Sequence, residues 1–206
     1  MDDIRDLKEL QLDALREVEN IGAGHAATAL SQMVNRQVMI SVPRIAVTRL
    51  EEVADLLGDP GEVVAAILLH MLGDLTGRTL LVFPEPAARR LCDLLLRRPL
   101  GTTQQFGMLE QSSLKEAGNI LCGAYMNALS AFMGMMLLPS VPSLVIDSSA
   151  AVLTSTYLNF GSDRDFVFCV ETRFTFATDD EELSGYFLLV PDFASLRAIL
   201  QAVRLT

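Results

Sequence analysis

The sequence contains few of the histidine and cysteine residues that metal sites and disulfide-bonded proteins require. It has no tryptophan, only two histidines and only three cysteines among its 206 residues. Two histidines are too few for the ligand sets of most zinc sites, so a histidine-based metal centre is not expected. The cysteines (Cys92, Cys122 and Cys169) are far apart and form no C-x-x-C pair. This odd, scattered set is typical of reduced core residues in a cytoplasmic protein.

Basic residues are also scarce. The 16 lysines and arginines are outnumbered by 26 aspartates and glutamates, which gives a net charge of −10 at pH 7. Nucleic-acid-binding proteins carry a basic face, and segments that attach to anionic membranes carry clusters of lysine and arginine. The sequence therefore predicts neither a nucleic-acid-binding protein nor one held at a membrane surface by charge.

Targeting and membrane-spanning segments are not expected. The first ten residues, MDDIRDLKEL, lack the basic and apolar regions of a signal peptide. Residues 117–146 contain no charged side chain and are long enough to cross a bilayer. Two asparagines and two prolines interrupt this run: Asn119, Asn127, Pro139 and Pro142. We therefore expect a buried helix followed by a turn, in a cytoplasmic protein without membrane insertion.

The chain contains an internal repeat. Residues 16–34 align without gaps with residues 115–133, at an offset of 99 positions. A second pair of similar segments, beginning at Gly77 and Gly185, has the pattern of a short buried strand, a proline-marked turn and an amphipathic helix. We therefore expect a single domain over residues 1–206, made of two internal repeats of about 1–101 and 102–206.

Strand-like runs lie between the repeated segments. They cover residues 37–50, 62–72, 144–158 and 165–178, and the alternation in RFTFAT is typical of a half-buried strand. The fold class predicted is α+β, a pseudo-two-fold duplication of a helix and strand unit. It has an antiparallel-rich sheet with two long helices on its surface.

Each long helix is predicted to carry a polar stripe. At 100° per residue, the stripe of the first helix falls within about 40° of one line. Its members are Asp13, Glu17, Asn20, Gly24, Ala27 and Ser31. Leu15, Val18, Gly22, Ala26, Ala29 and Met33 lie on the opposite face, which is expected to pack inward. The second helix repeats the stripe with Ser112, Glu116, Asn119, Gly123 and Ser130.

The glycines in these stripes need a physical reason. Glycine inside a helix costs about 1 kcal/mol relative to alanine. A glycine on the stripe indicates that something approaches the backbone closely. Glycine also suits tight packing between helices, and a single polar stripe is typical of a solvated surface. Two copies in the same register favour a functional face.

A dinucleotide-binding loop is a weaker interpretation of the same segment. GAGHAA fits the pattern G-x-G-x-x-A, which requires a strand immediately before it and a helix that begins at the glycines. A helical pattern precedes it instead, and the second copy, LCGAYM, lacks the first glycine. A nucleotide site is therefore not expected.

The two motifs, DALREVEN at residues 13–20 and SSLKEAGN at residues 112–119, resemble those of the CheC family of chemotaxis phosphatases, relatives of CheX and FliY. The resemblance covers nearly the whole chain. A chain with two motifs resembles CheC more than CheX, because CheX has only one motif. One position departs from the pattern. Glu19 stands where family members often have glycine, as the second motif does at Gly118. We expect this glutamate to place a bulky charge beside the first site.

The resemblance implies a phosphatase that hydrolyses the aspartyl phosphate of a CheY-type response regulator in chemotaxis signalling. Mg²⁺ is expected on the regulator, and no cofactor or metal is expected on this chain. The implied catalytic residues are Asn20 and Asn119, which orient the attacking water, and Glu17 and Glu116, which pair with a lysine of the regulator. The expected partner contacts are Asp13, Gly24, Ser112 and Gly123. The alternative is a non-catalytic adaptor that binds and regulates the receptor deamidase CheD, or a component of the flagellar switch.

Overall fold

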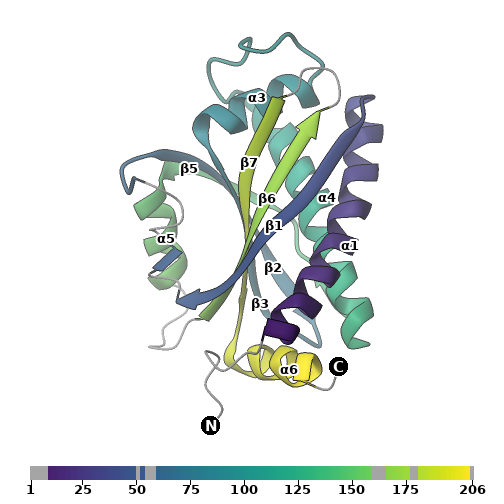
Figure 1. Ribbon diagram of the computed structural model, residues 1–206. Helices are drawn as coiled ribbons and strands as arrows, with labels where there is room; N and C mark the ends of the chain where they lie inside the picture. The colour runs from purple at the N-terminus through teal and green to yellow at the C-terminus, as the bar shows by residue number, and fades with distance from the viewer. Residues whose placement is uncertain (1–8, 50–51, 54–58, 159–165, 177–180, 205–206) are drawn as a thin grey trace.

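The computed structural model describes residues 9–49, 52–53, 59–158, 166–176 and 181–204. Two long helices lie side by side on one face of an antiparallel sheet (Figure 1). The helices are α1 (Glu9–Val34), α3 (Glu85–Leu95), α4 (Met108–Met133), α5 (Ser149–Leu158) and α6 (Phe193–Arg204). The strands are β1 (Val38–Arg49), β2 (Val63–Gly73), β3 (Gly77–Pro84), β4 (Leu137–Pro139), β5 (Ser143–Ser148), β6 (Phe166–Phe176) and β7 (Glu181–Pro191). This arrangement confirms the predicted α+β fold class.

The sheet has seven strands in the order β1-β6-β7-β3-β2-β4, with β5 paired to β2 as well. Every strand pair in the described residues is antiparallel. The hairpins β2-β3 and β6-β7 meet at the centre, where Leu80 pairs with Leu188. The edge strands are exchanged between the repeats, because β1 pairs with β6 of the second repeat, whereas β4 and β5 pair with β2 of the first.

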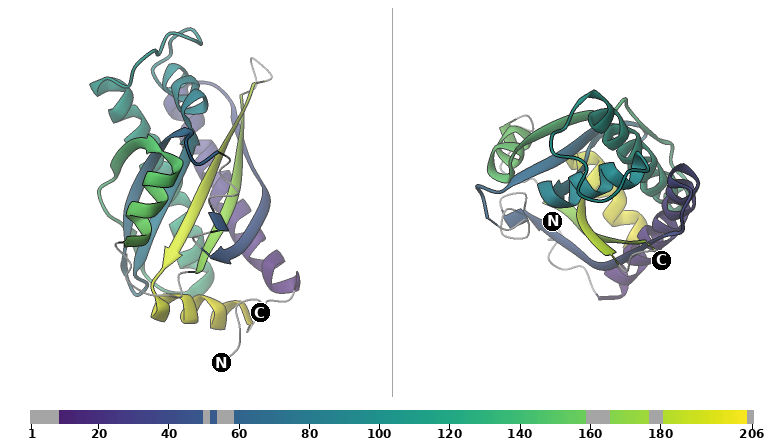
Figure 2. Two further views of the ribbon diagram at one scale, coloured as in Figure 1. Left: turned by 90° about the vertical axis from the view of Figure 1, so that its left-hand side faces the viewer. Right: turned by 90° about the horizontal axis from the view of Figure 1, so that it is seen from above.

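The core lies mainly between the sheet and the two long helices. The largest fully buried side chains include Phe83, Phe174 and Phe187 from the sheet and Tyr125 from α4. A smaller cluster on the other face of the sheet includes Val152 and Leu153 of α5. Figure 2 shows α5 and α1 on opposite sides of the sheet. The sides of α1 and α4 that face away from the sheet are therefore outside the main core.

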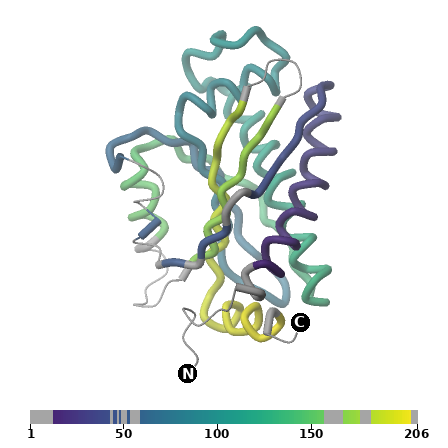
Figure 3. Tube along the Cα trace, in the orientation of Figure 1, coloured from purple at the N-terminus to yellow at the C-terminus, as the bar shows by residue number. Residues whose placement is uncertain are grey.

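The repeat continues past the helices into their C-terminal caps. Asn35 and Gly134, which are 99 positions apart, both have left-handed backbones with φ of 54° and 64°. This conformation ends a helix and is tolerated best by glycine and asparagine. A strand then begins in each repeat, at Val38 and at Leu137, again 99 positions apart. Figure 3 shows that the two helices are antiparallel, with α1 in purple and α4 running from teal to green.

One predicted strand is wrong in its second half. Of residues 144–158, only those up to Ser148 belong to β5, and the remainder form α5. The Ser148 hydroxyl accepts a hydrogen bond from the Ala151 N–H at 3.3 Å, as an N-cap does. The other strand-like runs correspond to β1, β2 and β6, apart from residues 50, 165, 177 and 178, which lie outside the described residues.

The uncharged run at residues 117–146 includes most of α4, which ends at Met133. Among the described residues, no helix combines the length and apolarity needed to cross a bilayer. Cys92, Cys122 and Cys169 are buried and form no disulfide, as expected. Burial raises the pKa of the Cys92 and Cys122 thiols to about 12, so both remain protonated at neutral pH.

Candidate functional site

The polar stripe of α1 lies on the surface. Asp13, Glu17, Asn20 and Gly24 are all exposed, whereas Ala27 and Ser31 are half-buried. The opposite face packs inward, with Leu15, Val18, Gly22 and Ala26 buried and Ala29 and Met33 half-buried. The face predicted to be functional is therefore open to a partner over its first three turns.

The stripe of α4 has the same layout with less exposure. Ser112 and Glu116 are exposed, and Asn119 and Gly123 are half-buried. The carboxamide of Asn119 is therefore still partly accessible to solvent, so it can contact a small molecule such as water.

The motif side chains are available for intermolecular contacts. Within the described part of the chain, no hydrogen bond or ion pair engages the side chains of Glu17, Asn20, Glu116 or Asn119. Asp13 differs, because its carboxylate accepts a hydrogen bond from Arg16 Nη1 at 2.9 Å, and both side chains are about half exposed. An exposed pair of this kind contributes little to stability. Asp13 can therefore exchange Arg16 for a partner at small cost.

The glycines of the first motif have different roles. A Cβ atom on Gly22 would lie 2.7 Å from Tyr125 Cδ1 and 3.0 Å from Tyr125 Cα, so this glycine allows α1 to pack closely on α4. A Cβ atom on Gly24 or Gly123 would meet nothing within 4 Å. These two glycines therefore have no packing role in the described structure, and they leave the backbone of the stripe bare.

The two motifs do not form one common site. Gly22 faces α4, and at 100° per residue the stripe of α1 lies about 180° away from it. On α4 the stripe likewise points away from Ala124 and Tyr125, the residues nearest Gly22. Since each stripe points away from the other helix, the motifs lie on opposite sides of the helix pair. Each motif also precedes the contact between Gly22 and Tyr125 in its own helix, so in antiparallel helices the motifs lie towards opposite ends. The structure thus has two separate candidate sites.

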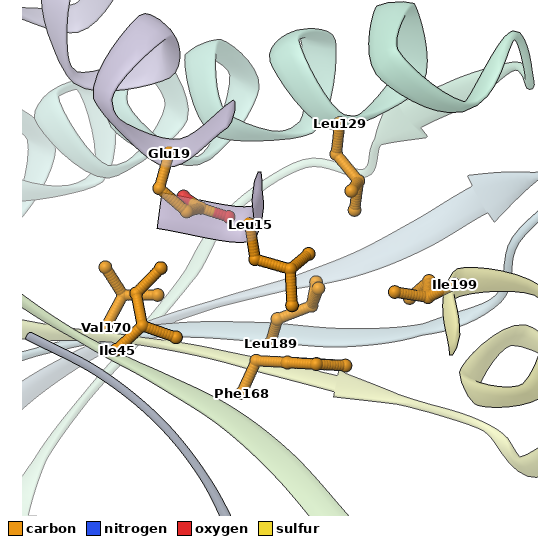
Figure 4. A pocket seen from close by; sticks show the side chains of 8 residues that line it. All are labelled: Leu15, Glu19, Ile45, Leu129, Phe168, Val170, Leu189 and Ile199. Atoms are coloured by element: carbon orange, nitrogen blue, oxygen red, sulfur yellow. The ribbon is translucent and has the colours of Figure 1, made fainter. Parts of the chain in front are cut away.

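Glu19 does not lie beside the first site, contrary to the expectation from sequence. Its side chain points to the sheet and is only 6% exposed. It lines a cavity of about 10 Å³, close to the smallest that can hold one water molecule (Figure 4). The other lining residues are Leu15, Ile45, Leu129, Phe168, Val170, Leu189 and Ile199.

The surroundings of Glu19 determine its charge. Burial raises its pKa from 4.5 to about 8, because the apolar lining disfavours the ionised form. Its Oε2 atom has no hydrogen-bond partner within the described residues. At neutral pH Glu19 is therefore mostly protonated and adds no charge to the first site.

The packing of α4 explains why the second motif has glycine at the corresponding position. A Cβ atom on Gly118 would lie 2.6 Å from Ile67 Cγ2 on β2. The second helix thus sits close to the sheet, whereas the first leaves room for a glutamate. The difference between the motifs reflects the core and not the exposed face.

The last residues of the stripes have structural roles. The Ser31 hydroxyl accepts a hydrogen bond from the Val38 N–H at 2.9 Å, and the Ser130 hydroxyl donates to the carbonyl of Met135. Both therefore fix the turn that follows their helix. Their positions in the helical period match the functional face, because periodicity does not show such bonds.

Two exposed apolar residues at the start of α4 were not among the residues predicted from sequence. Met108 is 91% exposed and Leu109 is 62% exposed. Helical periodicity could have identified them, because both lie near the line of the second stripe if the helix is extended back to Met108. In the described residues, no group of three or more histidine, cysteine, aspartate or glutamate side chains could hold a metal ion.

Comparisons with known proteins agree with the repeat. The model of the CheC-like family matches residues 10–47 and 109–146. The chain is 33% identical over 199 residues to the CheY-P phosphatase CheC of Bacillus subtilis, which covers 96% of this chain and 95% of that protein. It is 30% identical over 129 residues to the flagellar motor switch phosphatase FliY of B. subtilis, covering 62% of this chain and 33% of that protein.

Solved structures show the same fold. Thermotoga maritima FliY superposes with a TM-score of 0.77 at 20% identity, covering 97% of this chain and 98% of that chain. A chain of the CheX-CheY-BeF3-Mg²⁺ complex of Borrelia burgdorferi superposes with a TM-score of 0.50 at 14% identity, covering 82% of this chain and 95% of that chain.

Proposed function

Because this chain belongs to the CheC-like family, we propose that it is a phosphatase that hydrolyses the aspartyl phosphate of a CheY-type response regulator. The observation that carries the proposal is the pair of stripes that face solvent, each with a glutamate and, three residues later, an asparagine whose side chains make no hydrogen bond or ion pair within the described residues. The relative with 33% identity over nearly the whole chain is named a CheY-P phosphatase, which supports this substrate.

The reaction requires little covalent chemistry from this chain. Water attacks the phosphorus atom, the bond from phosphorus to the aspartyl oxygen breaks, and inorganic phosphate and the free carboxylate are released. An acyl phosphate is already activated, so catalysis consists mainly of positioning the water in line. The regulator's own Mg²⁺ supplies charge neutralisation when bound.

Asn20 and Asn119 orient the attacking water in this proposal. A carboxamide offers an oxygen that accepts and an NH₂ group that donates hydrogen bonds, but it is not a base. Neither carboxamide is engaged within the described part of the chain, so each can hold water without breaking an internal bond. Orientation of this kind is worth on the order of 10²-fold in rate, or about 3 kcal/mol.

Glu17 and Glu116 fix the position of the regulator. Each lies almost one helical turn before its asparagine and is exposed. A carboxylate in this place accepts a charge-assisted hydrogen bond from a lysine of the regulator, which sets the docked register. Gly24 and Gly123, about one turn beyond the asparagines, leave space for the incoming loops.

The test is phosphate release from the phosphorylated regulator, measured with the wild-type chain and with Asn20→Ala, Asn119→Ala and the double variant. We expect acceleration by the wild type and loss of nearly all of it in the double variant. Gln32→Ala is the matched control, because Gln32 is an exposed carboxamide on α1 about 100° away from the stripe. If neither the wild type nor any variant accelerates phosphate release from the regulator, the adaptor function would be favoured instead.

A further inference from the structure

Two apolar side chains extend the second stripe towards the start of α4. Met108 and Leu109 are 91% and 62% exposed, and the helix begins immediately after Gly107. At 100° per residue they lie about 50° to either side of the line through Ser112, Glu116 and Asn119. They thus face the same solvent region as the second motif, one on each side of its axis.

The distance from these residues to the motif is short on the scale of a protein domain. With a rise of 1.5 Å per residue, Leu109 lies about 10 Å and Met108 about 12 Å along the helix from Glu116. A domain of 100 residues has a radius of gyration of about 13 Å, so its footprint extends at least that far from its centre. A regulator centred on Glu116 and Asn119 therefore covers the first turn of α4.

We propose that Met108 and Leu109 form an apolar contact with the response regulator that docks on Glu116 and Asn119. This inference rests on the proposed function and names a further part of the same binding surface. An exposed methionine is flexible and adapts to an irregular apolar surface, and burying it removes apolar area from water. The contact adds affinity at a distance from the reacting phosphorus, so it acts on binding and not on the chemical step.

The contact belongs to the second site and not to the first. The offset of 99 places Glu9 at the position of Met108 and Leu10 at the position of Leu109. The first repeat thus keeps a leucine but has a glutamate in place of the methionine, so it cannot form the two-residue apolar contact. The two sites therefore differ in affinity for the regulator, and the second site binds it more tightly.

The test uses two backgrounds that each leave one site active. Asn20→Ala leaves the second site, and Asn119→Ala leaves the first. Met108→Ser with Leu109→Ser is introduced into both, and KM and kcat for the phosphorylated regulator are measured. Val141→Ser is the matched control, because Val141 is 88% exposed and lies between β4 and β5, outside both helices. Binding of the regulator loaded with beryllofluoride to each variant is measured in parallel.

In the Asn20→Ala background, the double serine substitution is expected to raise KM about tenfold or more, with kcat unchanged. In the Asn119→Ala background, and with Val141→Ser, KM is expected to stay within twofold. The melting temperature is expected to be unchanged, because both side chains are exposed. An unchanged KM and dissociation constant in the Asn20→Ala background, or equal effects in both backgrounds, would overturn the inference. A different result would overturn only the proposed phosphatase function. In that case the wild type would not accelerate phosphate release, but it would bind the regulator, and the double serine substitution would weaken that binding.

Discussion

Replacing Glu19 by glutamine is expected to make the stability of the protein less dependent on pH. The Glu19 carboxyl is 6% exposed among apolar residues, with Oε2 unpaired within the described residues, and burial raises its pKa to about 8. Glutamine has nearly the same shape and is never charged. The substitution therefore removes the titration while it preserves the packing around the cavity.

The sign and size of the effect follow from proton linkage. Between pH 4.5 and pH 8 the unfolded chain loses the Glu19 proton while the folded chain keeps it. Stability therefore falls as pH rises through this range, by about 1.4 kcal/mol per pH unit. Over about 3.5 pH units the loss approaches 5 kcal/mol, and it stops growing above pH 8.

Urea unfolding of the wild type and Glu19→Gln from pH 4 to pH 9 measures the difference directly, because titrations common to both proteins cancel. We expect equal free energies of unfolding near pH 4 and an advantage of several kcal/mol for the variant at pH 8. A difference that is constant across the range would refute the argument, since it would mean that Glu19 titrates normally in the folded state.

Three further substitutions test the packing and the exposed face. Gly118→Ala is expected to reduce the free energy of unfolding by about 1–3 kcal/mol in urea titrations, because its Cβ would lie 2.6 Å from Ile67 Cγ2. Gly123→Ala, with open space at its Cβ, is expected to raise stability by up to about 1 kcal/mol while it lowers the rate of phosphate release at the second site. Asp93→Ala is expected to cost about 2–4 kcal/mol in thermal unfolding, because the buried carboxylate accepts hydrogen bonds from the N–H groups of residues 101–103. An unchanged stability in Gly118→Ala or Asp93→Ala, or unchanged activity in Gly123→Ala, would contradict these assignments.

The repeat was the part of the fold most readily predicted from sequence. Matching residues at an offset of 99 predicted two long helices in the same register, and periodicity predicted which face of each is exposed. The exchange of edge strands between repeats was not predicted. Strand pairing depends on contacts between residues far apart in the chain, such as Ile45 with Val170, which no local pattern shows.

The helix α5 was missed for a local reason. Residues 149–158 combine two alanines, two leucines and a valine with two threonines and two serines, and a short, mainly apolar run of this kind fits either a strand or a buried helix. In the structure the segment is helical, and the Ser148 hydroxyl accepts a hydrogen bond from the Ala151 N–H in its first turn.

The error over Glu19 has a different origin. The 100° periodicity places Glu19 within about 40° of Leu15 and about 20° of Ala26 on the inward face, so the sequence did contain the signal. A carboxylate is rarely fully buried, which favoured the wrong interpretation. The roles of Gly22 and Gly24 could not be separated in advance, because only the position of Tyr125 on the neighbouring helix distinguishes them.

The measurement that tests the central claim most directly is the single-turnover loss of phosphate from the phosphorylated regulator at saturating amounts of this protein. Saturation removes differences in binding, so the rate reports the chemical step alone. The account predicts that Asn20→Ala with Asn119→Ala lowers this rate by on the order of 10²-fold, to near that of the regulator by itself, while Gln32→Ala leaves it unchanged. A double variant that still accelerates the reaction as the wild type does would contradict the assignment of these asparagines.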